Sequence, residues 1–397
     1  MKEEAIKAID ISRLNKFFEF FYSIIDAALD EGFNYERLVW TFNPEHIADP
    51  IYLPQAWLRK EALVLQLFAS KMHTLVIGPP GIGKTTITEF LNRIHFAFDR
   101  ATMVGGESGA VTTAAGLREK VIRLADLIKR EFDLVTDNVD IRNLPKAILH
   151  LEEFLKAPKG LRDVLKPIMN DFLLIVSQSQ RSDRAGRWLA PINIYADSNP
   201  PMQDDWIGPD FQSKKEQLKE FATEAAYIRR FTVVMALDRY NIKQNIVIRK
   251  FKEYIKVNPH PALESGEFYK KYEDFVRKHR RIKVKYTPAP IWVHEFIAGL
   301  EDLQDRGRVL LPIVYSDFID NIYAVAEAFA RINEHKEIEE EDWAKAVNFY
   351  ARIFETIANV EKTDKRSLYE RAIELGKRRE EEVKEMIERI EEKYNLT

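Results

Sequence analysis

The amino-acid sequence predicts an α/β fold, in which a parallel sheet is flanked by helices, followed by a smaller helical region. Two observations favour this class. Short apolar runs that suit buried strands alternate with stretches of helical periodicity up to about residue 241, and the pattern is almost entirely helical afterwards. We therefore divide the chain into an N-terminal helical segment (1–48), an α/β core (49–241), a helical region (242–355) and a charged helical arm (356–397).

The composition excludes several classes of protein. The chain of 397 residues contains no cysteine, which rules out disulfides and thiolate zinc sites. Its formal net charge of −3 provides no overall attraction to nucleic acid, so any such contact must come from local basic groups. Because no apolar run is long enough to cross a membrane and the N-terminus lacks a signal-peptide pattern, we expect a cytoplasmic protein with no membrane partner.

A glycine-rich segment at residues 78–85 (GPPGIGKT) follows the apolar run at 74–77 and precedes a helical pattern. The spacing G-x-x-x-x-G-K-T lets successive backbone N–H groups surround a triphosphate at the start of a helix. Lys84 would then reach the β and γ phosphates, and the Thr85 hydroxyl would bind Mg²⁺, so ATP and Mg²⁺ are the expected cofactors. The predicted nucleotide-binding residues are Gly78, Pro79, Pro80, Gly81, Ile82, Gly83, Lys84, Thr85 and Thr86.

Two acids end the next strongly apolar run, at residues 147–151. A buried strand has no use for adjacent carboxylates unless its end meets a cation or a reacting water. We predict that Glu152 supports Mg²⁺ and that Glu153 orients or deprotonates the attacking water. The alternative is a surface pair of acids at the start of a helix.

A β-hairpin is predicted before the following strand, which ends at Asn199. An amide at the end of such a strand would position water beside the γ phosphate. An ordinary Asn-Pro turn is the alternative.

With these elements in order, residues 49–350 resemble the AAA+ motor of the minichromosome maintenance (MCM) replicative helicases, in the clade with a β-hairpin before sensor 1. The most specific match is residues 105–115 (GGESGAVTTAA), similar to the segment that leads into the family's helix-2 insertion. Residues 151–154 (LEEF) stand where the family has I-D-E-F, and residues 196–200 (ADSNP) resemble its sensor-1 ending A-A-N-P. The resemblance implies a P-loop AAA+ core followed by a C-terminal α-helical lid at 242–355.

The same resemblance implies an ATP-hydrolysing ring, with six subunits expected, that translocates on or unwinds DNA. Arg230 stands at the arginine of the family's S-R-F sequence, so it would act as an arginine finger in the site of the adjacent subunit. The turn of the hairpin, which family members place in the channel of the ring, carries Arg181, Arg184 and Arg187. Repeated around a pore, these side chains would form a positive path for single- or double-stranded DNA, although a solvated polar turn is the alternative.

The chain also departs from the family. Only residues 1–48 precede the motor, so we expect the N-terminal DNA-binding domain of the family to be absent or supplied by a loader or another partner. The position of the family's sensor-2 arginine is occupied by Asp317, so either Arg306 or Arg308 replaces it or this sensor is lost. Two other functions therefore stay open: a protein-remodelling ATPase similar to MoxR or magnesium-chelatase motors, and a nucleotide-dependent assembly switch.

Overall fold

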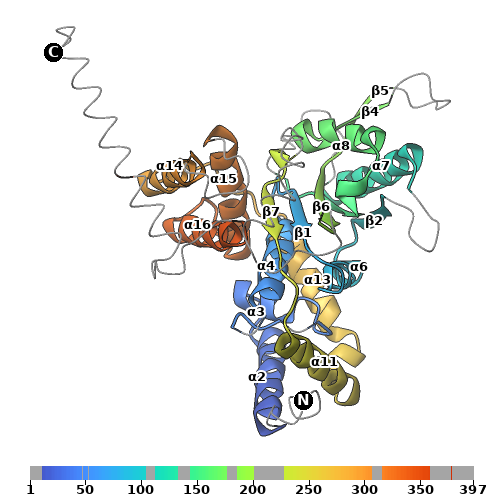
Figure 1. Ribbon diagram of the computed structural model, residues 1–397, viewed down its shortest axis with the longest axis vertical. Helices are drawn as coiled ribbons and strands as arrows, with labels where there is room; N and C mark the ends of the chain where they lie inside the picture. Colours follow the sequence, from blue (N-terminus) through green and yellow to red (C-terminus); the bar gives the residue numbers. More distant parts are fainter. Residues whose placement is uncertain are drawn as a thin grey trace.

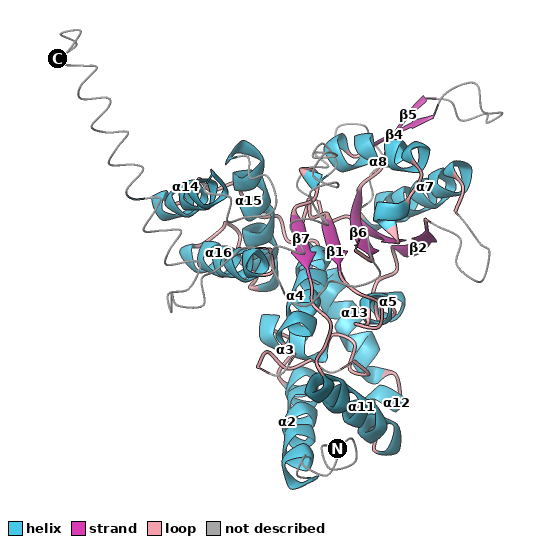
Figure 2. Ribbon diagram, viewed as in Figure 1, coloured by secondary structure: helices cyan, strands magenta, loops and turns pink. Residues whose placement is uncertain are grey.

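The computed structural model of this chain describes residues 11–46, 48–51, 53–103, 112–132, 144–176, 186–200, 228–305, 315–357 and 377. Its central feature is a parallel sheet with helices packed around it (Figures 1 and 2). The strand order is β2-β3-β6-β1-β7. The strands are β1 (Thr74–Ile77), β2 (Phe98–Thr102), β3 (Ala147–Glu152), β6 (Ile192–Ser198) and β7 (Val233–Ala236). This sheet confirms the predicted α/β class.

The three inner strands of the sheet are almost completely buried. Every residue of β1 and β6 is buried, and in β3 only Glu152 at the end is partly exposed. Such continuous apolar runs are typical of parallel strands that are covered on both faces. Pairing sets Glu152 opposite Thr102 on one side and Asp197 on the other, while Ile77 lies opposite Ser198. The carboxyl ends of these strands therefore meet at one edge of the sheet.

Helices that follow the strands cover this core. They are α5 (Lys84–Thr88), α6 (Leu91–Ile94), α7 (Ala114–Glu131) and α8 (Lys159–Asp171), with a 3₁₀ turn, η2 (Phe154–Lys156), after β3. A separate antiparallel pair, β4 (Leu173–Val176) and β5 (Gly186–Leu189), forms the arms of the expected hairpin. Arg187 is in β5, whereas Arg181 and Arg184 lie outside the described residues, as do most of the 105–115 segment and nearly all of the charged arm.

Residues 242–355 contain two groups of helices that pack in different places (Figure 1). The first, α11 (Ile242–Val257), α12 (Pro261–Glu264) and α13 (Glu267–His279), lies with α2 (Ile11–Asp30) and α3 (Tyr35–Thr41). The second, α14 (Ile291–Asp305), α15 (Tyr315–Ile332) and α16 (Glu340–Glu355), lies beside β7. Aromatic stacking joins the first group: Phe17 lies 4.7 Å from Phe251 and Phe18 lies 3.8 Å from Tyr254, measured between ring centroids.

The second group is joined to α4 (Pro54–Phe68), the buried helix before β1, by charged side chains. Arg331 of α15 is fully buried, and its guanidinium donates to Glu327 at 2.7 Å and to the carbonyl of Phe68 at 2.6 Å. Arg352 of α16 donates to the buried Glu61 of α4 at 3.0 Å. Buried charges are tolerated when each is paired in this way. Among the residues that the structure describes, none of the helices is long and apolar enough to cross a bilayer.

Candidate functional site

The glycine loop, residues 78–83, joins β1 to α5 at the carboxyl edge of the sheet. Its glycines are required by close packing and by backbone conformation. A Cβ atom on Gly78 would lie 2.6 Å from the Ile82 side chain, and Gly81 and Gly83 have φ angles of 83° and 74°, which favour glycine. Because these three positions carry no side chain, the backbone of the loop can pass close to the first turn of α5.

Lys84 is the first residue of α5, and its ammonium group folds back over the loop. It donates to the carbonyls of Gly78 at 2.7 Å and Pro79 at 3.0 Å, and to the Asn199 side chain at 2.9 Å. The structure thus brings together two side chains predicted to act on the same phosphate. Burial lowers the pKa of Lys84 to about 8, although the charges of Asp197 and Glu153 act in the opposite direction. Thr85 and Thr86 follow on α5, both partly exposed.

Glu152 ends β3 with its carboxylate held by neighbours on β2. The Thr102 hydroxyl donates to it at 2.8 Å, and the Arg100 guanidinium lies 3.4 Å away. Within the described residues no group of three or more His, Asp or Glu side chains is arranged as a ligand set. Mg²⁺ normally takes only one or two carboxylates and completes its shell with phosphate and water, so Glu152 and the Thr85 hydroxyl fit that chemistry.

Glu153 follows immediately and has an unusual backbone. Its φ angle of 57° lies in the left-handed region, which costs about 1 kcal/mol or more for a residue with a side chain. This conformation starts η2, and the carboxylate lies 3.4 Å from the ammonium of Lys156. Glu152 contacts Thr102 and Arg100 of β2, whereas Glu153 contacts Lys156 of η2, so the two acids are in different surroundings.

Arg230 lies at the opposite edge of the sheet from Lys84. It precedes β7, whose first residue, Val233, is opposite Thr74 at the start of β1. The neighbouring Arg229 donates to Asp317 of α15 at 2.9 Å, so the acid at the expected sensor-2 position is paired with an arginine from another segment. Within one chain, Arg230 and Lys84 are therefore not brought together.

Two side chains beneath the glycine loop were not predicted from the sequence. Arg59 of α4 is fully buried and donates to the carbonyl of Ile82 at 2.7 Å and to the Tyr240 hydroxyl at 2.8 Å. His46 is also buried, and its Nε2 would lie 2.7 Å from a Cβ atom on Gly83. Burial and the charges of Arg59 and Lys60 lower the pKa of His46 to about 3, so its ring is neutral at neutral pH. The available signal was the charged run Arg59-Lys60-Glu61 within a helix that is otherwise mostly apolar.

We expect Gly83→Ala to destabilise the protein by about 1–2 kcal/mol, because alanine is strained at a φ of 74° and its Cβ would collide with His46. Urea denaturation would measure the change in the free energy of unfolding. Gly160→Ala is a matched control, because nothing lies within 4 Å of a Cβ there and the helix α8 favours alanine. Similar losses for both variants would contradict the packing described for the loop.

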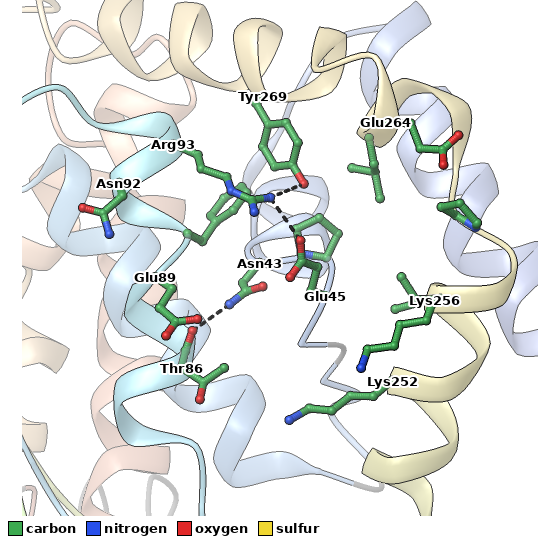
Figure 3. Close-up of a pocket in the computed structure, with 15 residues that line it drawn as sticks. Asn43, Glu45, Thr86, Glu89, Asn92, Arg93, Lys252, Lys256, Glu264 and Tyr269 are labelled. Carbon is green, nitrogen blue, oxygen red and sulfur yellow. Dashed lines mark hydrogen bonds and ion pairs between the residues drawn. The ribbon is translucent and has the colours of Figure 1, made fainter.

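A cavity of about 800 Å³ lies beside α5 and α6, with Thr86, Asn92 and Arg93 in its wall (Figure 3). One wall is formed by residues 43–45, where Asn43 donates to the carbonyl of Thr86 at 2.9 Å. Lys252 and Lys256 of α11 extend into it from the opposite side. Arg93 crosses one end, donating to Glu45 at 3.0 Å and to Tyr269 at 2.8 Å. Phe90, Ile255, Pro259 and Leu263 supply apolar surface.

Comparison with known proteins adds nothing to this geometry. No family model matches the chain, and no curated protein matches it.

Proposed function

We propose that this protein binds and hydrolyses ATP, and that it does so as a ring that translocates on or unwinds DNA. The observation that best supports the nucleotide site is the contact of Lys84 with Asn199 above the glycine loop. A lysine, an amide and two carboxylates at the carboxyl edge of a parallel sheet are the groups that phosphoryl transfer to water requires. The second part of the proposal, movement on DNA, rests on the resemblance to the MCM motor.

The reaction requires positioning more than covalent chemistry. ATP would supply the phosphoanhydride bond, and Mg²⁺ would neutralise part of its charge. The Lys84 ammonium would exchange its contacts with the carbonyls of Gly78 and Pro79 for phosphate oxygens. Asn199 and Glu153 would then hold the attacking water, with Glu153 accepting its proton.

The cavity beside α5 is suited to the nucleoside half of ATP. Its wall includes Thr86, two residues after Lys84, so a nucleotide with its phosphates on the glycine loop would leave its ribose at this point. The volume lies within the range of small-molecule sites, and the lining combines apolar surface with a few polar groups. We assign the base and ribose to this cavity.

The test of this function is the rate of ATP hydrolysis by the purified chain, with no DNA, with single-stranded DNA and with duplex DNA. Strand displacement on a forked duplex is measured in parallel. Stimulation by DNA supports a DNA motor. Hydrolysis that ignores DNA would instead favour a protein-remodelling ATPase, and a chain that does not bind ATP would refute the nucleotide site itself.

A nucleotide-dependent switch is the second candidate, and one observation favours it. Asp317 occupies the position where the resemblance expects a sensor arginine, and it is paired with Arg229. An acid at that position would place no positive charge beside the phosphates of ATP, so hydrolysis would be slow. Binding of ATP with tight assembly and very slow turnover would support this candidate.

If the hairpin contacts DNA, replacing Arg181 and Arg184 together by alanine should remove stimulation by DNA. Both residues lie outside the described part of the chain, so this prediction depends on the resemblance and on their charge. Hydrolysis without DNA should stay within about twofold of wild type, because neither arginine is assigned to the ATP site. A double variant of Arg277 and Lys278, which are exposed on α13, also removes two positive charges and is therefore the control. Unchanged stimulation in the hairpin variant would exclude this contact.

A further inference from the structure

Arg59 differs from the other buried arginines of this protein. Arg280 lies 3.4 Å from the carboxylate of Glu131, and Arg331 lies 2.7 Å from that of Glu327, so each has an acid as partner. Arg59 is equally buried, yet within the described residues it forms no ion pair, and its Nε and Nη1 groups have no hydrogen-bond partner there. Its two bonds, to the Ile82 carbonyl and the Tyr240 hydroxyl, both involve neutral groups.

The surroundings of Arg59 make this charge more costly. Lys60, the next residue, is also fully buried, and burial together with the charge of Arg59 holds the pKa of the Lys60 ammonium well below its usual value. Lys84 stands on the other side of the glycine loop, and Arg59 lowers its pKa as well. Arg59 and Lys84 therefore contact the same loop, while the Lys60 ammonium lies near the carbonyls of Trp40 and Asn43. A buried cation without a counter-charge is unfavourable, so this arrangement needs an anion.

We propose that Arg59 is a positioning residue of the nucleotide site, whose charge is compensated by the phosphate groups of the bound nucleotide. The inference rests on the proposed function, because it assigns the anion to the glycine loop. Arg59 holds the loop from below through the carbonyl of Ile82. Through the Tyr240 hydroxyl it also contacts the segment that leads into α11, the helix whose lysines enter the cavity. Phosphate binding therefore stabilises the loop and this segment together.

Charge compensation by a bound phosphate and a purely structural role of Arg59 differ in their thermodynamic consequences. In the nucleotide-free protein the charge of Arg59 is a cost, and a bound anion offsets it. Replacing Arg59 by a neutral residue that can still donate to Ile82 should therefore leave the free protein about as stable as wild type. The same replacement should weaken nucleotide binding, because the anion loses a cation in a poorly solvated position.

The experiment compares wild type, Arg59→Gln and Arg59→Lys by thermal unfolding and by titration with ATP and Mg²⁺ or with inorganic pyrophosphate. We expect Arg59→Gln to keep the wild-type melting temperature without ligand, to bind ATP about tenfold more weakly and to lose most of the ligand-induced rise in melting temperature. Arg59→Lys supplies an ammonium that bound phosphate would keep charged, so it should restore part of the affinity. Arg280→Gln is the control, expected to melt earlier and to keep the wild-type affinity for ATP.

Three other outcomes would contradict either the role of Arg59 or the nucleotide site itself. Wild-type affinity in Arg59→Gln would overturn the proposal, because the charge would then be irrelevant to the ligand. Failure of Arg59→Gln to fold would also overturn it, because the guanidinium would then stabilise the free protein. If wild type itself shows no binding of ATP or pyrophosphate, the proposed function fails, which is a different result from a failure confined to Arg59.

Discussion

Replacement of Arg230 by alanine should reduce ATP hydrolysis by about 10³- to 10⁵-fold while ATP binding stays close to wild type. ATP binding should be spared because Arg230 lies at the edge of the sheet opposite to the glycine loop. The four residues of β7 separate the two edges, a span of roughly 13 Å. Arg230 therefore cannot serve the glycine loop of its own chain, but in a head-to-tail ring it would enter the site of the adjacent subunit. Steady-state hydrolysis and equilibrium ATP binding would measure the two quantities separately.

Arg229→Ala is the matched control for this variant. Its ion pair with Asp317 is exposed at both side chains, so its loss should cost less than about 1 kcal/mol and leave most of the activity. Mixing gives a sharper test. Lys84→Ala and Arg230→Ala subunits should each be inactive alone, but a mixed ring would contain interfaces with an intact lysine from one and an intact arginine from the other. Recovery of hydrolysis on mixing is expected, and no recovery would contradict a site shared between subunits.

The fold class could be predicted because its signals are local. The apolar run at β1, the glycine spacing after it and the acids at the end of β3 each occupy a few consecutive residues. Their meeting at one edge follows from the geometry of parallel strands, which explains why Lys84 and Asn199 lie close together. No knowledge of long-range packing was needed for this step.

Contacts between distant segments could not be predicted in this way. Arg59 and Tyr240 are 181 positions apart, and nothing in the sequence near either residue indicates the other. Arg229 and Asp317 are 88 positions apart, and neither segment indicates that the two side chains pair. Helical periodicity identified helices after residue 242, but it carries no information about which surface each one covers. The placement of α11–α13 beside α2 and α3 depends on aromatic packing that only the folded chain reveals.

Replacement of Glu153 by glutamine should give the second large effect, a loss of about 10²- to 10⁴-fold in hydrolysis with ATP still bound. Glutamine has nearly the same shape and can keep the backbone of η2, but its amide cannot accept a proton from the attacking water. Single-turnover hydrolysis would measure the chemical step, and ATP binding would be measured on the same protein.

Two comparisons make the Glu153→Gln result specific. Glu253→Gln, an exposed carboxylate on α11, should be indistinguishable from wild type. Glu152→Gln should act differently from Glu153→Gln, because its carboxylate is held by Thr102 and Arg100 and is assigned to Mg²⁺. Its loss should raise the Mg²⁺ concentration needed for activity, whereas excess Mg²⁺ should not rescue Glu153→Gln. If the two variants responded alike to Mg²⁺, the separate roles assigned to these adjacent acids, which have different partners, would be wrong.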